Sequence, residues 1–569
     1  MKEKNTDNSS KKKIISALGG ILALVFYAVS CIVVMRNNAA AELENADISG
    51  DLKIITIAHW QLEDGFREGI NYAIKEFEKL KAAQGQKVKV IQNAIPSRGF
   101  SQWYITQLIS GNPADIIELT TSPEIQSRYF LPLSTYISKP NPFNKGTPCE
   151  NIPWKDSFND GLDGSLNPIF AEYFGVGVFR HCQRIYVNMD LLKAATGSEK
   201  TPESFEELLE CCQKVEEYAQ KIKKPIIPMG VRGIDKSTVG TLYSRFNNQI
   251  NTHYNDLLTY YGDGTLPKAD IFTAFGEGKL DIDRLLVPAE LVKNIGKYFS
   301  DGFTTTDSQQ TKYLFFTGNV CFFMEGSWDA WTMVNNTPFN VKIIRVPTIS
   351  SDGKYGKYFV GKTLESAFSV SGKFGITKDS RHRELALEFL QFLTSWEINQ
   401  KTMMEFCKWP GSIKNIPYTG FLEAMKPDDG DARRSIQSPL MFNSKSRIQI
   451  LECLENIIIE QPENTKLEFA KGALKNIPVL KEEFKNVVSD LERQLFDMEG
   501  NRTCISAKLL QSDLTENERE NQEIRSLMAA ESLVARELER QQSIAAYNAM
   551  DHIKPQLENY ISKNEKRGE

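Results

Sequence analysis

The first part of the chain alternates between two patterns of apolar positions. Short apolar runs of strand length occupy 52–58, 88–91 and 114–119. Between them, apolar residues recur every three or four positions through 66–80 and again through 103–109, which is the spacing of a helix that buries one face. The resulting order of strand, helix, strand, helix, strand predicts a parallel sheet covered by helices.

The same alternation resumes after a loop that is rich in proline and asparagine. Apolar runs at 175–179 and 185–187 predict two more strands, and Thr201 followed by Pro202 is expected to cap and begin a helix. A further amphipathic helix is expected at 383–396. A second α/β unit therefore follows the first.

The last ninety residues have a different character. Apolar residues from Leu480 to Leu495 mark an amphipathic helix that is expected to end near Gly500, and the chain from Cys504 to Ala549 contains no glycine or proline. This predicts a long helix that packs on a neighbour, forms a helical hairpin or stays solvated on the surface. A coiled-coil dimer stays open, because some apolar positions keep a heptad spacing (Leu510, Leu514, Ile524, Leu527, Val534 and Leu538).

The N-terminus carries a segment long enough to cross a bilayer. Residues 14–35 contain no charged side chain, and at about 1.5 Å per residue they span roughly 33 Å. Three lysines at 11–13 precede the segment, which favours a cytoplasmic N-terminus, a single-pass anchor in the cell membrane and a binding domain on the extracytoplasmic side. Two alternatives stay open: lipid modification at Cys31, and cleavage near 39–41.

Composition and motifs exclude several classes of function. The 569 residues have a formal net charge of -5, so no basic surface for nucleic acid is expected. The nine cysteines are scattered, without a CxxC pair, and the five histidines are isolated, so neither a disulfide framework nor a metal site is indicated. Phosphate-binding, nucleophile-elbow and dinucleotide-binding motifs are missing from the sequence. We expect no cofactor and no enzymatic activity.

Several stretches, taken together and in order, resemble a known family. They are Ser110-Gly-Asn-Pro-Ala-Asp-Ile-Ile117 with Leu131-Pro-Leu133, then 185–192 with 201–208, the segment Phe315-Phe-Thr-Gly-Asn-Val-Cys-Phe-Phe-Met-Glu-Gly-Ser-Trp328, and 386–395. This series is similar to the extracellular solute-binding proteins of ABC transporters, in the carbohydrate-binding group that includes the maltose-binding protein. The helical C-terminal extension has no counterpart in that group.

The resemblance implies an α/β fold of the two-lobed periplasmic-binding-protein type II, with a hinge between the lobes and the ligand held between them. It divides the chain into a cytoplasmic N-terminus (1–13), a transmembrane anchor (14–35), a linker (36–50), lobe 1 (51–176, with 366–415 returning to it), lobe 2 (177–365, with 416–480 returning to it) and a helical C-terminal extension (481–569).

Candidate ligand-binding residues follow from the chemistry of sugars. A sugar ring has an apolar C–H face beside a rim of hydroxyls, so it needs flat aromatic surface and polar side chains that donate and accept hydrogen bonds. Trp328 can supply the flat surface, while Gly326 and Ser327 are expected to let ligand and backbone approach closely. The simpler alternative is a turn whose tryptophan folds back into the core.

The other candidates lie at the expected ends of strands, where open α/β sheets place their ligands. Trp60 and His59 end the first strand, and Glu118, Thr120 and Thr121 end the third. Each has a structural alternative, as a core side chain or as part of a capped turn. The resemblance adds the cleft re-entry residues Phe179, Arg180 and His181 and the cleft-side Trp409, although a charged residue at this re-entry could simply pair with a carboxylate. Trp331 lies one helical turn after Trp328 and is expected to support it.

The function expected from these residues is capture of a carbohydrate and its delivery to the transmembrane subunits of an ABC permease, without covalent chemistry. A membrane-tethered sugar receptor or sensor with the same fold is the first alternative, and in it the C-terminal extension would contact a helical partner or another copy. A glycan-active enzyme and a binder of peptides, polyamines or another small polar solute are the others.

Overall fold

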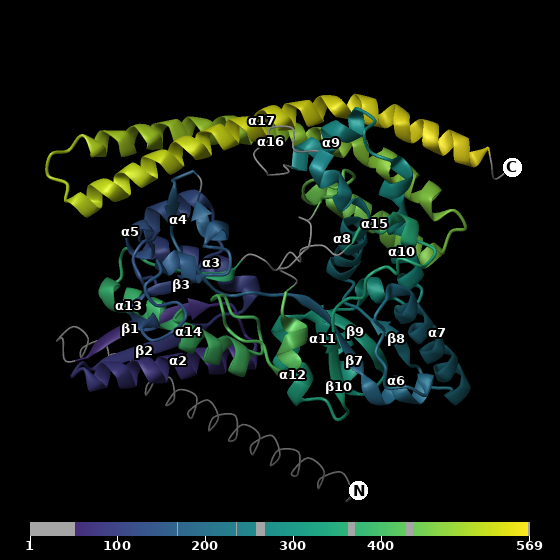
Figure 1. Cartoon of the computed structure of the whole chain (residues 1–569), viewed down its shortest axis with the longest axis horizontal. Coiled ribbons are helices and arrows are strands. Elements are labelled where there is room, and N and C mark those ends of the chain that lie inside the picture. The colour runs from purple at the N-terminus through teal and green to yellow at the C-terminus, as the bar shows by residue number, and fades with distance from the viewer. Residues whose placement is uncertain are drawn as a thin grey trace, which may run out of the picture.

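The computed structural model describes residues 52–167, 169–234, 236–257, 268–361, 370–427 and 436–566, which form two α/β lobes and a long helical hairpin (Figure 1). The expected anchor at 14–35 lies outside the described residues. Within them, no helix is both long and apolar enough to cross a bilayer.

Lobe 1 is built on a five-stranded mixed sheet in the order β2-β1-β3-β11-β6. β1 pairs in parallel with both β2 and β3, which confirms the parallel arrangement that the sequence pattern predicts. β11 runs antiparallel to β3 and β6. The strands are β1 (Lys53–His59), β2 (Val88–Ala94), β3 (Ile116–Glu118), β11 (Ser371–Ile376) and β6 (Val176–Phe179).

Helices cover both faces of this sheet (Figure 1). Neighbouring residues of β1 contribute to different apolar clusters, because successive side chains of a strand point to opposite faces: Ile57 packs with α2 and α13, whereas Ala58 packs with α3. The helical elements are α2 (Asp64–Ala83), α3 (Ser97–Ser110), α4 (Pro123–Tyr129), α5 (Ser134–Ile137), α13 (Arg383–Leu393), α14 (Trp396–Asn399) and the π-helical η9 (Gln400–Cys407). Shorter elements are η1 (Pro142–Asn144), η2 (Trp154–Ser157), η3 (Asp163–Ser165), β4 (Leu166–Asn167) and β5 (Glu172–Tyr173).

Lobe 2 is built on a four-stranded sheet in the order β10-β7-β9-β8, in which β7 runs antiparallel to both neighbours and β8 runs parallel to β9. Its strands are β7 (Gln183–Asn188), β8 (Ile227–Gly230), β9 (Val320–Gly326) and β10 (Val341–Ile344). Its helices are α6 (Met189–Thr196), α7 (Phe205–Ile222), α8 (Ser237–Asn251), α9 (Lys268–Gly276), α10 (Ile282–Gly296), α11 (Ser308–Phe316), α12 (Ala330–Asn335) and α15 (Ser444–Glu460). Short turns are η4 (Thr252–Leu257), η5 (Phe303–Thr305), η6 (Ser327–Asp329), η7 (Gly356–Tyr358) and η10 (Gly420–Met425).

The chain passes from lobe 1 to lobe 2 over three residues, 180–182. β6 ends at Phe179 in the first sheet and β7 begins at Gln183 in the second. The first passage therefore follows β6, slightly later than the expected boundary at 176. The chain returns to lobe 1 before β11 and re-enters lobe 2 before α15.

Two expected helix boundaries are corrected by local hydrogen bonding. α7 begins at Phe205 instead of at Pro202, because the Ser204 hydroxyl caps it by accepting a hydrogen bond from the Glu207 amide at 3.1 Å. The helix expected at 383–396 ends earlier, at Leu393, and α14 follows it as a separate turn.

The C-terminal extension is an intramolecular hairpin of two long helices, α16 (Thr465–Leu509) and α17 (Glu516–Glu565). The expected end near Gly500 is wrong: α16 continues through this glycine, whose cost of about 1 kcal/mol is small in a helix that packs along its length. The turn comes nine residues later, and a capping box between Thr515 and Glu518 begins α17.

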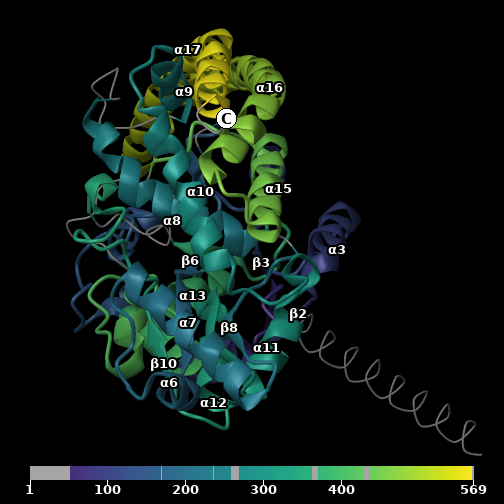
Figure 2. The ribbon, with the colours of Figure 1, turned by 90° about the vertical axis from the view of Figure 1, so that its right-hand side faces the viewer.

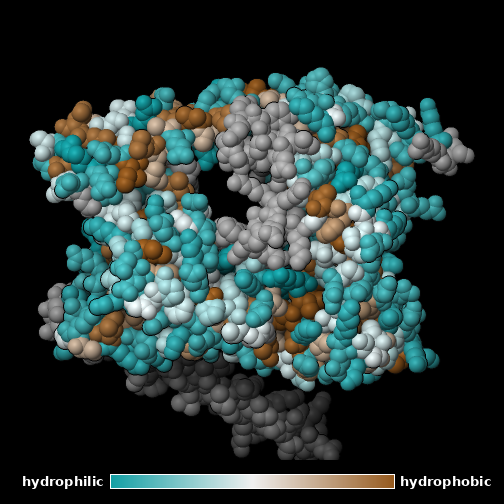
Figure 3. Space-filling view, viewed as in Figure 1, coloured by the Kyte–Doolittle hydropathy of each residue, from teal (hydrophilic) through white to brown (hydrophobic). Residues whose placement is uncertain are grey.

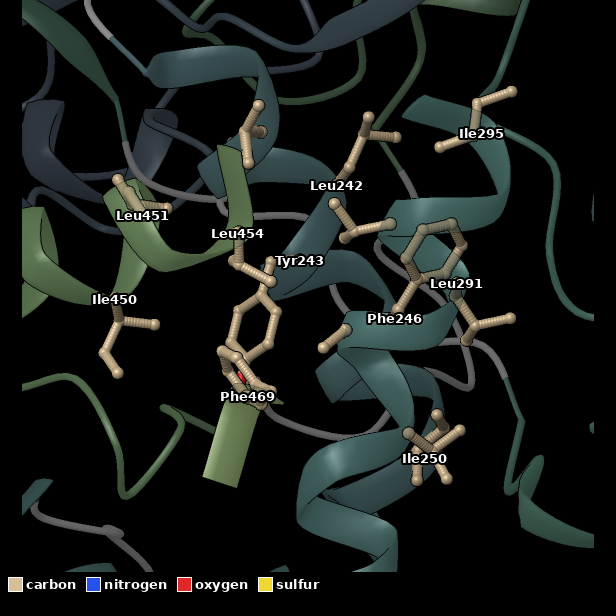
Figure 4. Close-up of a cluster of buried hydrophobic side chains, with 14 of the residues drawn as sticks. Leu242, Tyr243, Phe246, Ile250, Leu291, Ile295, Ile450, Leu451, Leu454 and Phe469 are labelled. Atoms are coloured by element: carbon tan, nitrogen blue, oxygen red, sulfur yellow. The ribbon is translucent and has the colours of Figure 1, made fainter. Parts of the chain in front are cut away.

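The base of the hairpin belongs to the core of lobe 2. Figure 4 shows Phe469 of α16 beside Tyr243 of α8, with ring centroids 5.6 Å apart. Figure 2 shows α15 and α16 side by side on the same flank of the molecule, and these two helices are in contact. Further along α16, Phe484 stacks on Phe442 at 4.0 Å. The hairpin is thus an outgrowth of lobe 2.

Glu483 of α16 caps the N-terminus of α15. Its carboxylate accepts hydrogen bonds from the backbone amides of Asn443 at 3.1 Å, Lys445 at 2.8 Å and Ser446 at 3.1 Å, and its side chain is buried. These amides have no partner within α15 because they belong to its first turn. One buried carboxylate therefore joins the two helices.

We predict that Glu483→Ala lowers the free energy of unfolding by about 2 kcal/mol, because it leaves buried amides unpaired. Urea-induced unfolding followed by circular dichroism measures the change. Glu482→Ala is the matched control, since the Glu482 side chain is 62% exposed and its ion pair with Lys445 is long, at 3.7 Å. Equal effects of the two substitutions would contradict the capping role.

Candidate functional site

The candidate site lies between the two lobes, at the carboxyl ends of strands from both sheets. β1, β3 and β6 of lobe 1 finish at His59, Glu118 and Phe179, and β9 of lobe 2 finishes at Gly326. Figure 3 shows an opening between the two lobes, bounded on one side by the α16–α17 hairpin. In open α/β sheets, ligands bind beyond the carboxyl ends of the strands, so the segments that follow these strands form the candidate site.

Trp328 lies in η6, directly after β9, and is half-buried. Its indole folds back over Gly326, where a Cβ atom would overlap the ring. The glycine therefore makes room for the indole, which corrects the expectation that it makes room for a ligand. The centroid of the His181 ring lies 6.1 Å from that of Trp328. The indole thus has one side against its own turn and stands beside the passage between the lobes.

Ser327 holds the end of β9 against the passage. Its backbone amide donates to the carbonyl of Cys182 at 2.8 Å, and its hydroxyl accepts from the amide of Cys182 at 3.2 Å. Ser327 is fully buried. Its side chain positions the neighbouring Trp328 and is covered in this structure.

Trp331 lies in α12, against the start of α2 in lobe 1. A Cβ atom at Gly65 would lie 3.1 Å from the indole of Trp331, so the absence of a side chain at Gly65 lets the two lobes approach at this point. Trp331 is half-buried. Lobe 2 thus brings two indoles, Trp328 and Trp331, to the boundary with lobe 1.

Glu118 forms the centre of the lobe 1 part of the site. Its carboxylate accepts from the Gln61 side-chain amide at 2.9 Å and from the backbone amide of Trp60 at 3.3 Å. Glu118 is only 2% exposed, and burial raises the pKa of its carboxyl to about 7. The indole of Trp60 is half-buried and packs beside the α3 aromatic residues.

His59 is fully buried and packs edge-on against Phe66, with ring centroids 5.1 Å apart. Burial lowers the pKa of its imidazole to about 4, so the ring is neutral at pH 7. Both Glu118 and His59 are therefore shifted toward their uncharged forms. His181, which hydrogen-bonds Ser371 at 3.0 Å, shifts in the same direction, since burial lowers its pKa as well.

The two threonines that follow β3 differ in their surroundings. Thr120 is exposed, and its hydroxyl forms a hydrogen bond with that of Ser101 at 3.0 Å. The hydroxyl of Thr121 is buried and has no hydrogen-bond partner among the described residues. Its backbone carbonyl accepts from Gln126 at 2.7 Å.

Phe179, Arg180 and Trp409 lie in the packed base of the site. Phe179 contacts Trp409 edge-to-face at 4.8 Å, and Trp409 also stacks on Phe66 at 5.3 Å. Trp409 is 2% exposed and Arg180 is 1% exposed. The amide of Arg180 donates to the carbonyl of Pro410 at 2.8 Å. These residues pack beneath the strand ends as part of the core. Phe66 and Phe179 and the rest of the described residues cover the ring of Trp409 almost completely.

Glu63, Asp329 and Lys312 were not among the sequence candidates. Lys312 donates to Asp329 at 2.8 Å within lobe 2. Burial raises the pKa of Glu63 in lobe 1. The negative charge of Asp329 raises this pKa further and the positive charge of Lys312 lowers it, so a charged pair of lobe 2 acts on a carboxylate of lobe 1. One oxygen of Glu63 is buried without a hydrogen-bond partner in the described part of the chain. Its position directly before α2, after the first strand, is the signal that could have identified it.

The site contains indoles, hydroxyls, amides, two carboxyls whose pKa is raised by burial, and the Lys312–Asp329 ion pair. No group of three His, Cys, Asp or Glu residues that could hold a metal ion occurs among the residues that the structure describes. This donor set can bind a polar, uncharged molecule by stacking and hydrogen bonding.

Comparison with solved structures supports the two-lobed fold. The chain is similar to a chitin oligosaccharide binding protein (TM-score 0.50, 15% identity, 75% of this chain and 98% of the other). It is also similar to the bacterial solute receptor AcbH (TM-score 0.51, 13% identity, 74% and 97%) and to a protein of xylan utilization from Caldanaerobius polysaccharolyticus (TM-score 0.50, 13% identity, 74% and 99%). At these identities the likeness shows the shared fold alone. A search of curated proteins finds no match.

The family comparison is more direct. The model of the family described as bacterial extracellular solute-binding protein matches residues 63–400, which is more than half of the chain. The matched range begins at Glu63. It includes the strand ends at Glu118, Phe179 and Gly326 and leaves out the end of β1 at His59. It confirms the resemblance found in the sequence motifs. The chain belongs to the family of bacterial extracellular solute-binding proteins.

Proposed function

We propose that this protein captures a carbohydrate, either a sugar or an oligosaccharide, between its two lobes for delivery to an ABC importer. The observation that carries the proposal is that half-buried indoles and polar groups with shifted pKa values lie on the segments that follow the strand ends of both lobes. Three solved structures of the same fold support it by their titles, which name chitin oligosaccharide, β-D-galactopyranose and xylan utilization.

Trp60, Trp328 and Trp331 are the proposed apolar surfaces. All three are half-buried, so each ring is held by packing while part of it stays exposed. A flat ring held in this way matches the C–H face of a pyranose, which contains few polar atoms. Trp60 belongs to lobe 1 and the other two to lobe 2, so a sugar between them contacts both lobes.

The proposed polar contacts favour an uncharged ligand. A Glu118 carboxyl with a pKa of about 7 and an imidazole at His59 with a pKa of about 4 both avoid full charge near neutral pH. A protonated carboxyl donates one hydrogen bond and accepts others, as a sugar hydroxyl does. Thr120 and Thr121 extend the same surface, and the free oxygen of Glu63 is a further acceptor for a ligand hydroxyl.

Capture works by differential affinity, without a covalent step. A ligand that touches both lobes binds the closed arrangement better than an open one, so its binding shifts a hinge equilibrium. The passage 180–182 is one described part of that hinge, and the segment between η9 and η10 crosses between the lobes as well. An importer can recognise the closed form by the relative position of the two lobes.

We propose further that residues 14–35 anchor the protein in the cell membrane, with the two lobes on the extracytoplasmic side. The uncharged apolar segment and the preceding lysines support this arrangement. Lipid modification at Cys31 and release by cleavage are the alternatives. A tethered sugar receptor is the alternative function, and the C-terminal hairpin, which begins beyond the matched residues 63–400, is the feature that favours it.

Trp328→Ala is expected to weaken binding of the preferred sugar by about tenfold or more, because a lost aromatic face removes about 1.5 kcal/mol. A thermal-shift screen of mono- and oligosaccharides identifies the ligand, and calorimetry measures its affinity. Tyr313→Ala is the control, since Tyr313 is a 67% exposed aromatic residue of the same lobe. An unchanged affinity in a folded Trp328→Ala protein would remove Trp328 from the site. Peptide or polyamine binding, or turnover of a glycan, would contradict the proposed function.

The pKa of Glu118 predicts a specific pH dependence of stability. The folded pKa of about 7 lies above the ordinary value of 4.5, so folding favours the protonated form. Its stabilising contribution is complete below pH 4.5 and is lost as the pH rises to 7, by on the order of 3 kcal/mol. His59 acts oppositely: its folded pKa of about 4 lies below the ordinary 6.5, so its contribution is lost as the pH falls.

Comparison with Glu118→Gln isolates the contribution of this one carboxyl. The substituted side-chain amide cannot ionise, so the Tm of the variant relative to that of the wild type is expected to rise between pH 5 and pH 8. Thermal unfolding at intervals across this range measures the difference. A difference that does not vary with pH would show that the carboxyl does not titrate there.

Deletion of residues 1–35, with an unrelated cleavable export signal in their place, is expected to move the protein from the membrane to the soluble fraction. Ultracentrifugation of cell extracts followed by immunoblotting measures the distribution. Cys31→Ser separates the alternatives: a transmembrane anchor retains this variant in the membrane, whereas a lipid anchor loses it. If the unaltered protein is instead recovered from the soluble fraction with a shortened N-terminus, cleavage is indicated.

A further inference from the structure

The α16–α17 hairpin reaches from lobe 2 across the opening to lobe 1 (Figures 1 and 3). At about 1.5 Å per residue, helices of 45 and 50 residues are roughly 70 Å long, which is enough to span both lobes. The family match ends at residue 400, before the hairpin begins. The hairpin is therefore an addition to the family's matched region that contacts both halves of the molecule.

The base of the hairpin is fixed firmly to lobe 2. A Cβ atom at Gly276 of α9 would lie 2.6 Å from Ala549 of α17, so these helices are in very close contact. The side chain of Gln556 donates to the carbonyls of Phe275 at 3.0 Å and Gly276 at 3.1 Å. Ala549 itself is 6% exposed. The base thus moves with lobe 2.

The two helices also contact each other at the base and midway, where Arg540 of α17 pairs with Glu492 of α16 at 3.4 Å. Lys481 of α16 pairs with Asp551 of α17 at 2.7 Å, and Lys471 pairs with Glu565 at 3.2 Å. These helices form an extensive contact. A motion of the base is therefore transmitted to the far end.

The far end of the hairpin makes polar contacts with lobe 1 at residues 169–172. Arg525 of α17 forms an ion pair with Glu172 at 3.3 Å, in which the Glu172 side chain is 1% exposed and that of Arg525 is 17% exposed. The guanidinium also donates to the carbonyl of Phe170 at 3.5 Å. Asn501 of α16 donates to the carbonyl of Ile169 at 3.4 Å. Both helices of the hairpin thus contact the same short segment.

An apolar contact accompanies these polar ones. Ala171 is fully buried in a cluster with Ile505 of α16 and Ala529 of α17. Its φ of 44° is unfavourable for a residue with a side chain, and such a conformation persists where surrounding contacts hold it. Glu172 is fixed as well, because it accepts from the Ser134 amide at 2.9 Å. The hairpin therefore meets a rigid part of lobe 1.

We propose that the α16–α17 hairpin is a brace that restricts the hinge between the lobes. Rotation of lobe 1 about the passage 180–182 displaces residues 169–172 relative to Arg525, because the hairpin moves with lobe 2. The ion pair and the Ala171 contact oppose this displacement. The unliganded protein is accordingly held near one interlobe angle, and loss of the brace contact releases a wider range of angles.

The test measures the distance between the lobes in the unliganded full-length protein. Spin labels on genetically encoded amino acids replace Lys79 on α2 and Lys193 on α6, whose side chains are 73% and 63% exposed. Double electron–electron resonance then gives the distance distribution in detergent. We expect a single narrow distribution for the wild type and one about twofold broader for Arg525→Glu, which places two negative charges together at the contact.

Arg502→Glu is the matched control, because it makes the same charge change at an exposed position of the hairpin. Its distance distribution is expected to match that of the wild type. Ile505→Ala is a second variant, which weakens the apolar contact without introducing a charge. If circular dichroism shows that Arg525→Glu is unfolded, the distance distribution of Ile505→Ala tests the brace instead. Folded variants whose distributions match the wild type would overturn the brace. The test uses no ligand, so its outcome is independent of whether the protein binds a carbohydrate.

Discussion

The candidate site depends on how the segment 180–182 is held between the two sheets. Ser327 makes two hydrogen bonds to Cys182, at 2.8 and 3.2 Å, and so fixes the end of β9 beside the passage. Arg180 donates to Pro410 at 2.8 Å, which fixes the loop after η9 to the same segment. Because the passage also continues β6, these few bonds set the relative positions of strand ends from both lobes.

Local physical rules explain why much of lobe 1 could be predicted from sequence. Alternation of strand-length runs and helical spacing predicted the parallel pairing of β1 with β2 and β3, since short connections leave few other arrangements. The antiparallel insertion of β11 between β3 and β6 could not be derived, because it joins residues that are distant in sequence. The end of α16 was misplaced for a related reason: packing against α17 outweighs the local cost of Gly500.

The sequence pattern did not predict how far each candidate site residue is buried. Trp328 lies just beyond β9 and Trp409 just beyond η9, yet one is half-buried and the other lies between Phe66 and Phe179 in the core. Periodicity cannot distinguish them, because their exposure depends on contacts from other parts of the chain. The position of Glu63 directly before α2 is only a weak signal, because its burial and the influence of Asp329 on its pKa are properties of the assembled lobes.

Buried acids connect the fold with the proposed capture of a ligand. Burial raises the pKa values of Glu118 and Glu63, so the charged forms of both side chains are disfavoured in the unliganded protein. A hydroxyl that donates to such a carboxylate lowers that cost, and it does so most where the lobes exclude water. The charges of Asp329 and Lys312 in lobe 2 act on Glu63 in opposite directions, so the ionisation of this lobe 1 carboxyl depends on the position of lobe 2. In the proposed capture, a ligand that bonds to these acids while touching both lobes binds the closed arrangement best, which is the condition for shifting a hinge.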